Sequence, residues 1–327
     1  MSNIETDTPE VNEVASFSPT KAAPQPNPTE PNLSTSRAGN PPSIRNVDPE
    51  QPDNSNVGGT NVSTIQPQQD AQPGEEATVL IAEADKLIRT GDSGIIAARD
   101  KLNEAMRIPM SPAQRSNVKD RLSKLSEQWL FSRTALPNDP LCENYQVKRD
   151  ETLEAIATRY KVPWEILLQI NKISRPEALQ AQSTIKVING PFRAIVYRST
   201  FTMDLYLQNT YVRSFKVGLG KPGMETPTGL WRVKPGGKLV KPIWTNPIDG
   251  KTYHPEDPDY PLGSRWIALE GLSGEAKDRT GFAIHGTKEP EQIGAAGSQG
   301  CIRLHNGEAV LVYNLLVPTY SQVEVTN

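Results

Sequence analysis

One histidine and one cysteine stand in glycine-rich surroundings near the C-terminal end of the chain. His285 is followed by Gly286 and Thr287, and Cys301 lies in the run Ser298-Gln299-Gly300-Cys301. The chain has only two cysteines and three histidines, so the pair is not a by-product of a cysteine-rich composition. A thiolate is a strong nucleophile, and an imidazole can take the thiol proton and later pass it to an amine. The fold must bring the two together, because sixteen positions separate them.

The neighbouring residues suggest supporting roles. We expect Cys301 to be the nucleophile and His285 the general base and acid, with the imidazole raising the thiolate fraction. The carbonyl of Gly286 would orient the ring, and the backbone N–H groups of Gly300 and Cys301 would stabilise an oxyanion. Arg303 shares a face with Cys301 in an extended segment, so it either binds a substrate carboxylate or braces the loop.

This frame resembles the signature of the YkuD-type L,D-transpeptidase catalytic domain. A second piece, Thr226-Pro227-Thr228-Gly229, resembles the upstream turn of that family. The resemblance covers roughly residues 190–327 and implies that Ser298 and Thr287 join Arg303 in substrate binding. Relatives most often carry a histidine where this chain has Gln299, but the pair of His285 and Cys301 does not depend on it.

The remaining cysteine and histidines have ordinary explanations. Cys142 is expected to be a small buried side chain. His254 lies in a loop rich in proline and aspartate, and His305 lies beside a helix start, where Asn306 can act as the cap. Neither CxxC nor HxxxH spacing occurs, so we expect no metal site and no cofactor.

Length and composition limit the organisation of the chain. Its 327 residues are enough for two or three domains. Hydrophobic residues make up 36% and prolines number 29, which indicates that part of the chain does not pack into a core. A net charge of −3 gives no reason to expect a nucleic-acid partner. No apolar run approaches the ~20 residues that span a bilayer, and residues 1–7 lack the basic and apolar regions of a secretory signal.

The N-terminal part divides into two segments. Residues 1–74 are rich in Pro, Ser and Gln with almost no aromatic side chains, which predicts a disordered linker. Residues 75–135 carry apolar side chains at helical spacing and predict three helices that resemble a tetratricopeptide hairpin with a partner. Ser111 followed by Pro112 is a helix start signal.

Residues 143–189 read as a small β-α-α-β unit that resembles a LysM domain. LysM domains bind glycans that contain N-acetylglucosamine, chiefly peptidoglycan and chitin. The resemblance implies weak glycan contacts from four residues, because the usual glycine of the loop is replaced by Asp150. These residues are Asp150, Glu151, Thr152 and Asn171.

Residues 191–327 alternate as β-strands do and are interrupted by loops dense in glycine and proline. The strands are expected near residues 194–197, 203–207, 211–217, 266–269, 282–284 and 322–325. This pattern predicts a mostly-β catalytic domain with closed or sandwiched sheets. The whole chain is therefore expected to be multidomain.

The resemblance implies peptidoglycan L,D-transpeptidation. Cys301 would form an acyl-enzyme with a stem tetrapeptide and transfer it to an amine, with peptidoglycan as the partner and the cell envelope or periplasm as the location. Two alternatives stay open. The first is an L,D-carboxypeptidase, in which water replaces the amine, and the second is a non-catalytic LysM protein that binds the wall.

Overall fold

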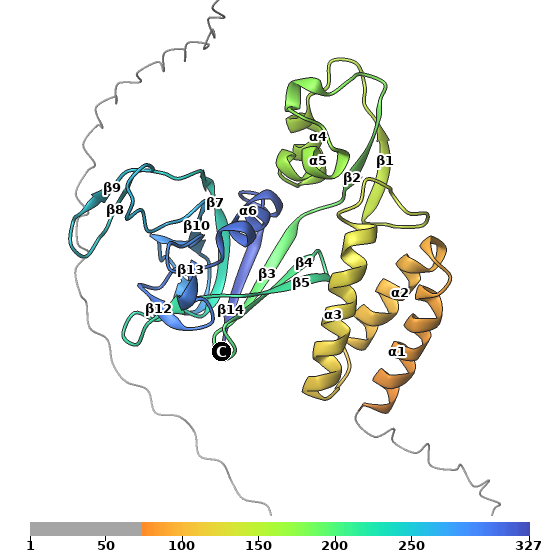
Figure 1. Cartoon of the computed structure of the whole chain (residues 1–327), viewed down its shortest axis with the longest axis horizontal. Coiled ribbons are helices and arrows are strands. Elements are labelled where there is room, and N and C mark those ends of the chain that lie inside the picture. The colour runs from red at the N-terminus through yellow and green to blue at the C-terminus, as the bar shows by residue number, and fades with distance from the viewer. Residues whose placement is uncertain (1–73) are drawn as a thin grey trace, which may run out of the picture. The chain divides into compact units, whose positions relative to one another are not determined.

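A computed structural model describes residues 74–327, so the linker expected over 1–74 lies outside the described residues except for Gly74. Figure 1 shows a helical part, a small unit built on two strands and two helices, and a β-rich part at the C-terminal end. Within residues 74–327, no helix is both long and apolar enough to cross a membrane.

The first part consists of α1 (Glu75–Ile88), α2 (Asp92–Ala105) and α3 (Pro112–Trp129). The expected start of α3 is confirmed by a capping box. Ser111 Oγ accepts a hydrogen bond from Gln114 N at 3.2 Å, and Gln114 Oε1 accepts one from Ser111 N at 3.0 Å. The apolar stripe of α3 is buried and ends at Trp129.

α3 packs against the β-rich part through polar contacts as well as apolar ones. Lys119 Nζ lies 2.5 Å from the buried carboxylate of Asp204. Asn103, on α2, accepts a hydrogen bond from Tyr211 N at 2.8 Å. Because these groups are largely withdrawn from water, their pairing makes the contact between helices and sheet specific.

The small unit, here called the βααβ unit, runs from β1 (Cys142–Gln146) through α4 (Leu153–Tyr160) and α5 (Trp164–Asn171) to β2 (Thr184–Ile188). A short 3-10 helix, η1 (Pro176–Ala178), precedes β2. β1 and β2 pair antiparallel, with Cys142 opposite Ile188.

The β-rich part is built on one eight-stranded sheet in the order β13-β11-β10-β7-β14-β3-β4-β5. The bounds are β3 (Phe192–Tyr197), β4 (Thr202–Leu207), β5 (Thr210–Lys216), β7 (Gly229–Leu239), β10 (Trp266–Gly271), β11 (Phe282–His285), β13 (Ile302–Arg303) and β14 (Gln322–Thr326). All six expected strands are present, and the domain is mostly β as predicted.

The two edges of this sheet meet. Just after β5, Gly218 N donates to Arg303 O at 3.0 Å, and Arg303 N donates to Gly218 O at 2.8 Å. A Cβ at position 218 would lie 3.0 Å from Gln292 O and 3.3 Å from Arg303 Cβ, so a glycine permits this approach. The expected closure is thus made by a two-bond bridge within a single sheet.

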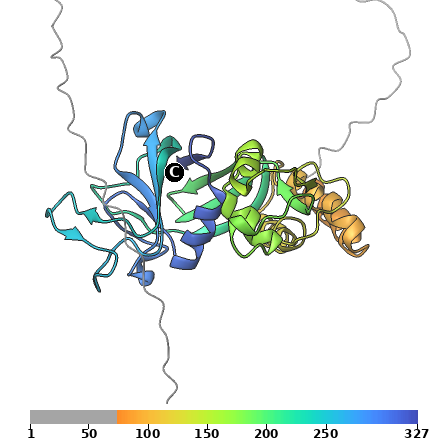
Figure 2. The same cartoon turned by 90° about the horizontal axis from the view of Figure 1, so that it is seen from above.

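Smaller elements decorate the sheet. β6 (Leu219–Gly220) pairs with β12 (Ala296–Ser298), and β8 (Trp244–Thr245) forms a hairpin with β9 (Thr252–Tyr253). η2 (Gly274–Ala276) and η3 (Pro290–Gln292) are short 3-10 helices. α6 (Asn306–Leu315) contacts β10, β11 and α5, and it lies between the sheet and the βααβ unit in Figure 2.

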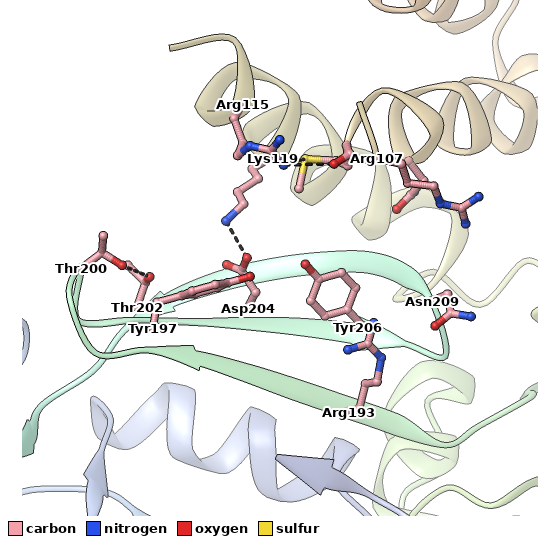
Figure 3. A pocket seen from close by; sticks show the side chains of 12 residues that line it. Arg107, Arg115, Lys119, Arg193, Tyr197, Thr200, Thr202, Asp204, Tyr206 and Asn209 are labelled. Atoms are coloured by element: carbon pink, nitrogen blue, oxygen red, sulfur yellow. Dashed lines mark hydrogen bonds and ion pairs between the residues drawn. The ribbon is translucent and has the colours of Figure 1, made fainter. Parts of the chain in front are cut away.

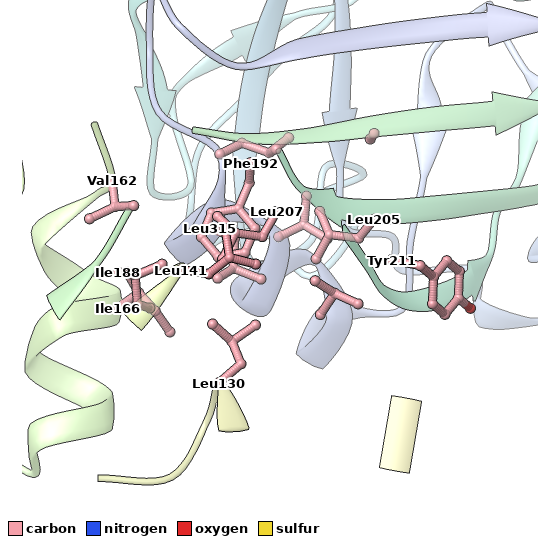
Figure 4. Packing of buried hydrophobic residues seen from close by; sticks show 14 of the residues in the cluster. Leu130, Leu141, Val162, Ile166, Ile188, Phe192, Leu205, Leu207, Tyr211 and Leu315 are labelled. Carbon is pink, nitrogen blue, oxygen red and sulfur yellow. The ribbon is translucent and has the colours of Figure 1, made fainter. Parts of the chain in front are cut away.

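One continuous cluster of buried apolar side chains runs through all three parts. Leu130 follows α3, Ile166 and Ile188 belong to the βααβ unit, and Phe192 and Leu315 belong to the β-rich part, yet they pack together (Figure 4). Burial of this surface stabilises the three parts jointly, because each removes apolar area of the others from water.

Lys186 is the buried polar link in this arrangement. Its ammonium donates to three backbone carbonyls at and just beyond the end of α3, those of Trp129, Ser132 and Thr134, at 2.6, 3.1 and 3.0 Å. Asn171 fixes the backbone of Lys186, because its side-chain Oδ1 accepts a hydrogen bond from Lys186 N at 2.7 Å.

Replacing Lys186 with methionine keeps the aliphatic stem but leaves three carbonyls without a donor. We expect Lys186→Met to lower the free energy of unfolding by roughly 2–4 kcal/mol. Denaturant unfolding of the full chain measures this, with the exposed Lys148→Met as the control. Equal stability of the two variants would contradict the structural role of Lys186.

Candidate active site

His285 and Cys301 lie at neighbouring strand ends. β11 ends at His285, and Cys301 directly precedes β13. β11 and β13 pair in parallel, with Ile284 opposite Ile302. Both side chains line one cavity of about 160 Å³. The structure therefore brings together the two residues that the sequence separates by sixteen positions.

The imidazole of His285 is enclosed and oriented. Its side chain stacks on Trp266, with ring centroids 5.6 Å apart and planes inclined by 24°. Nδ1 lies 2.6 Å from the carbonyl oxygen of Gly286, which only accepts, so Nδ1 carries the proton and Nε2 carries the lone pair of the neutral ring. Burial lowers the pKa of His285 to about 4.

The thiol of Cys301 is also held in its neutral form. Burial raises its pKa to about 11, although the charge of Arg303 acts in the opposite direction. Its Sγ lies 4.0 Å from the carbonyl oxygen of Gly281. Burial thus favours the neutral thiol and the neutral imidazole in the resting site. The expectation that the imidazole raises the thiolate fraction stays a prediction, and burial acts against it.

The turn before Cys301 is closed by Ser298. Its hydroxyl donates to the carbonyl of Cys301 at 2.6 Å and accepts from Gly300 N at 3.1 Å. The N–H of Gly300 is therefore engaged, so the expectation that it is a free oxyanion donor is wrong. The hydroxyl of Ser298 is held by the turn but its side chain also lines the cavity of Cys301, and substrate binding by Ser298 stays a prediction. Within residues 74–327, Cys301 N makes no hydrogen bond and remains available as a donor.

Gly300 is needed for the shape of that turn. Its φ of +109° is strained for any residue with a side chain, and an added Cβ would lie 2.7 Å from the ring of Phe282. Its carbonyl accepts a hydrogen bond from Thr226 Oγ1 at 2.9 Å, and Thr226 Oγ1 in turn accepts from Gly220 N at 3.1 Å. Thr226, the first threonine of the Thr-Pro-Thr-Gly motif, is thus a positioning residue, a role that the sequence did not reveal.

The loop after His285 is fixed by Asn306. Its Oδ1 accepts from Ser264 N and Thr287 N at 2.9 and 3.2 Å, and its Nδ2 donates to Thr287 O at 2.9 Å. Thr287 is buried and its Oγ1 accepts from Glu289 N, so the expectation that it binds substrate is wrong. Asn306 is the first residue of α6 and not its cap, since His305 occupies the cap position.

Arg303 lines the cavity and is braced at the same time. Its Nη1 donates to Glu289 Oε2 at 3.2 Å and to Gln292 Oε1 at 2.7 Å. The sequence left two roles open for Arg303, binding a substrate carboxylate and bracing the loop, and these contacts brace the loop. The cation still faces the cavity that holds Cys301, where it adds positive potential.

Aromatic side chains form a wall that the sequence reading missed. Trp244 and Tyr253 stack across the β8–β9 hairpin, with ring centroids 5.9 Å apart, and both line the cavity. Trp244 and Tyr253 lie at equal distances on either side of the turn at Pro247–Gly250, and this spacing could have predicted their pairing in a hairpin. Gln299 lines this cavity and also the adjoining one that contains Glu225 and Glu275.

The other singled-out residues lie away from this cavity. His254 and His305 do not line it. Cys142 is buried and free, and burial raises its pKa to about 12. The minor roles expected for these three residues agree with their places in the fold.

The four residues expected to touch glycan are in different environments. Asn171 is buried and bonded to Lys186, so it cannot contact a glycan and that expectation is wrong. Glu151 is engaged by Arg159, Tyr145 and a backbone N–H, which hold its pKa at about 2. Thr152 accepts from Ala155 N as the cap of α4. Asp150 is exposed at a φ of +62°.

Comparisons with known proteins agree with this geometry. The family model of the L,D-transpeptidase catalytic domain, YkuD, matches residues 191–325, and that of the LysM domain matches residues 145–187. The chain is 30% identical over 189 residues to an L,D-transpeptidase YkuD of Bacillus licheniformis, which covers 56% of this chain and 98% of the relative. It is 32% identical over 133 residues to an L,D-transpeptidase YqjB of Bacillus subtilis, covering 41% and 70%.

Among solved structures, an L,D-transpeptidase from Mycobacterium smegmatis is similar at 16% identity and a TM-score of 0.31, covering 45% of this chain and 64% of that one. The matches in sequence include the strands and turns that carry His285 and Cys301. Because nearly the whole length of the Bacillus licheniformis relative aligns, the chain belongs to the YkuD family of L,D-transpeptidases, with a LysM domain preceding the catalytic domain.

Proposed function

We propose that this protein is a peptidoglycan L,D-transpeptidase in which Cys301 is the nucleophile and His285 the general base and acid. The observation that supports this most directly is the shared cavity, which is lined by Cys301 and by a histidine whose tautomer is set by Gly286. A neutral imidazole with a free Nε2 lone pair is ready to accept a proton, whereas an imidazolium is not.

The reaction proceeds in two acyl transfers. Cys301 Sγ attacks the carbonyl of the third, L-centred stem residue while its proton passes to His285 Nε2, and Cys301 N donates to the oxyanion. The imidazolium then gives that proton to the departing amine of D-alanine, leaving a thioester. An acceptor amine attacks the thioester, loses a proton to His285, and the thiol is restored.

We propose transfer to an amine as the first candidate reaction. The rings of Trp244, Tyr253 and Trp266 in the cavity lining support it, because apolar surface beside the thioester reduces contact with water. Hydrolysis of the same intermediate, the L,D-carboxypeptidase reaction, is the second candidate. Mass spectrometry of muropeptides incubated with the protein separates the candidates, because it distinguishes cross-linked from trimmed products and from unchanged ones.

The substrate class places the protein in the cell envelope. Peptidoglycan is the partner of both matched domains under this proposal, and the βααβ unit would hold glycan near Cys301 at raised effective concentration. The unit is followed at once by β3 of the catalytic sheet, with only residues 189–191 between them. Such a short connection keeps bound glycan close to the reacting stem peptide.

Substitution of the nucleophile tests the chemistry. Cys301→Ala should abolish both cross-linking and trimming of muropeptides while leaving thermal unfolding unchanged, since the side chain makes no structural hydrogen bond shorter than 4.0 Å. Cys142→Ala is the matched control and should keep full turnover. A thiol-reactive electrophile should label Cys301 much faster than Cys142, which is 1% exposed. An active Cys301→Ala variant would overturn the assignment.

The pH profile tests the charge state of the base. Neutral imidazole is the active form and persists above its pKa, here about 4. We therefore expect kcat/KM for a soluble donor peptide to stay level as the pH falls from about 7 to about 5.5, where a base of ordinary pKa near 6.5 loses about tenfold.

His285→Ala should lower kcat by about 10²–10⁴-fold or more, and His254→Gln and His305→Gln should be mild. In the pH profile, a fall in kcat/KM centred near the ordinary histidine pKa would show that His285 is not held neutral in the working enzyme.

Asp150→Gly tests the glycan role of the βααβ unit. Asp150 has the left-handed backbone that glycine adopts freely, so the substitution restores the usual residue of the loop without distorting it. We expect more protein to sediment with purified sacculi, with unchanged turnover of a soluble donor peptide. Asn138→Gly, at a φ of +60° outside the unit, is the control for the relief of backbone strain. Equal sedimentation of both variants and the parent would contradict a glycan-binding loop.

A further inference from the structure

A second cavity lies between the helical part and the far end of the catalytic sheet. Its volume is about 750 Å³, and its lining residues come from the α2–α3 region and from β3 and β4. It shares no residue with the cavity of Cys301. The cavity of Cys301 is lined from residues 244–303, whereas this one is lined from residues 103–119 and 193–209, so it is separate from the site of chemistry.

The charges around this cavity are unbalanced. Its only carboxylate, Asp204, is matched by Lys119 at 2.5 Å and also accepts from Ser214 Oγ at 2.6 Å. Three arginines remain: Arg107, Arg115 and Arg193. Within residues 74–327, none of the three lies within ion-pair distance of a carboxylate.

Two of these arginines are held in place by contacts that leave N–H groups free. Arg115, on α3, donates from Nη1 to Met106 O at 3.0 Å and from Nη2 to Ile108 O at 3.4 Å, and its side chain lies beside Lys119 at the level of the helices (Figure 3). Arg193 donates only from Nε, to Gln208 O at 2.7 Å, and its guanidinium lies 4.4 Å from the ring centroid of Tyr206. Arg107 follows α2 and is exposed.

Like charges gathered around one cavity repel one another, and an anion placed among them relieves that repulsion. A guanidinium fixed by one edge presents its remaining N–H groups as a fork that matches carboxylate and phosphate. Tyr197 and Tyr206 add hydroxyl groups and flat ring faces to the same wall. The cavity is large enough for a ligand with more than one anionic group.

We propose that this cavity is a binding site for a multiply anionic ligand, held through carboxylate or phosphate groups by Arg107, Arg115 and Arg193. The ligand does not enter the chemistry at Cys301. Instead the site holds a remote anionic segment, so that the protein has a second anchoring point besides the βααβ unit. Carboxylates of a peptide and phosphates of a polymer are the two sources of this chemistry.

Calorimetric titration of the full chain with two probes tests the site and separates the sources. Oligo-γ-glutamate represents carboxylate ligands, and tripolyphosphate represents phosphate ligands. We expect at least one to bind with a stoichiometry of one and to raise the melting temperature of the protein. Binding should weaken as salt is added.

Substitutions show whether the arginines are responsible. Arg107→Gln combined with Arg193→Gln should weaken binding about tenfold or more and remove the rise in melting temperature. Lys124→Gln combined with Lys234→Gln removes the same charge from exposed positions that do not line the cavity, and it should leave the affinity within about twofold of the parent. All variants should turn over a soluble donor peptide at the parental rate.

Arg107→Gln alone guards against misfolding of the double variant, because no described hydrogen bond or ion pair depends on the Arg107 side chain. It should weaken binding severalfold at unchanged stability. Absence of binding by both probes, or equal weakening by the arginine pair and the lysine pair, would overturn the proposal.

Discussion

The active site depends on the two hydrogen bonds that join Gly218 to Arg303. This bridge connects the chain just after β5 to β13, the opposite end of the strand order, and so closes the eight-stranded sheet. The bridge supports β13 on the side away from β11, to which β13 is paired directly. Cys301 precedes β13 and His285 ends β11, so the β11–β13 pairing brings the two residues together and the bridge holds β13 in place.

Polar side chains near that bridge use their hydrogen bonds to hold the backbone around Cys301 and His285. Ser298 closes the turn before Cys301, Thr226 holds the carbonyl of Gly300, and Asn306 ties the loop after His285 to α6. Each of these groups makes hydrogen bonds within the protein, and under the proposed function the thiol, the imidazole and Cys301 N are the reacting parts. Rigid support of this kind holds a small number of reactive atoms in position.

Burial has two opposite uses in the molecule. In the cavity of Cys301 it favours the neutral forms of the thiol and the imidazole. Between the helices and the sheet, buried Asp204 pairs with Lys119 and fixes α3 on β4 and β5. The shared apolar cluster then makes the helical part, the βααβ unit and the sheet stabilise one another.

Four features could be predicted from the sequence: the residue types for the chemistry, the β-rich class of the C-terminal part, the βααβ order and the start of α3 at Ser111. These follow from local spacing, capping chemistry and period-two alternation, which depend on neighbouring residues alone. The tertiary structure decided which polar groups are free. Ser298, Thr287 and Asn171 look like ligand contacts in sequence, but packing turns each toward a backbone partner. The importance of Thr226 was equally hidden, because its partner, the carbonyl of Gly300, is 74 positions away and hydrogen bonds between distant segments leave no local pattern.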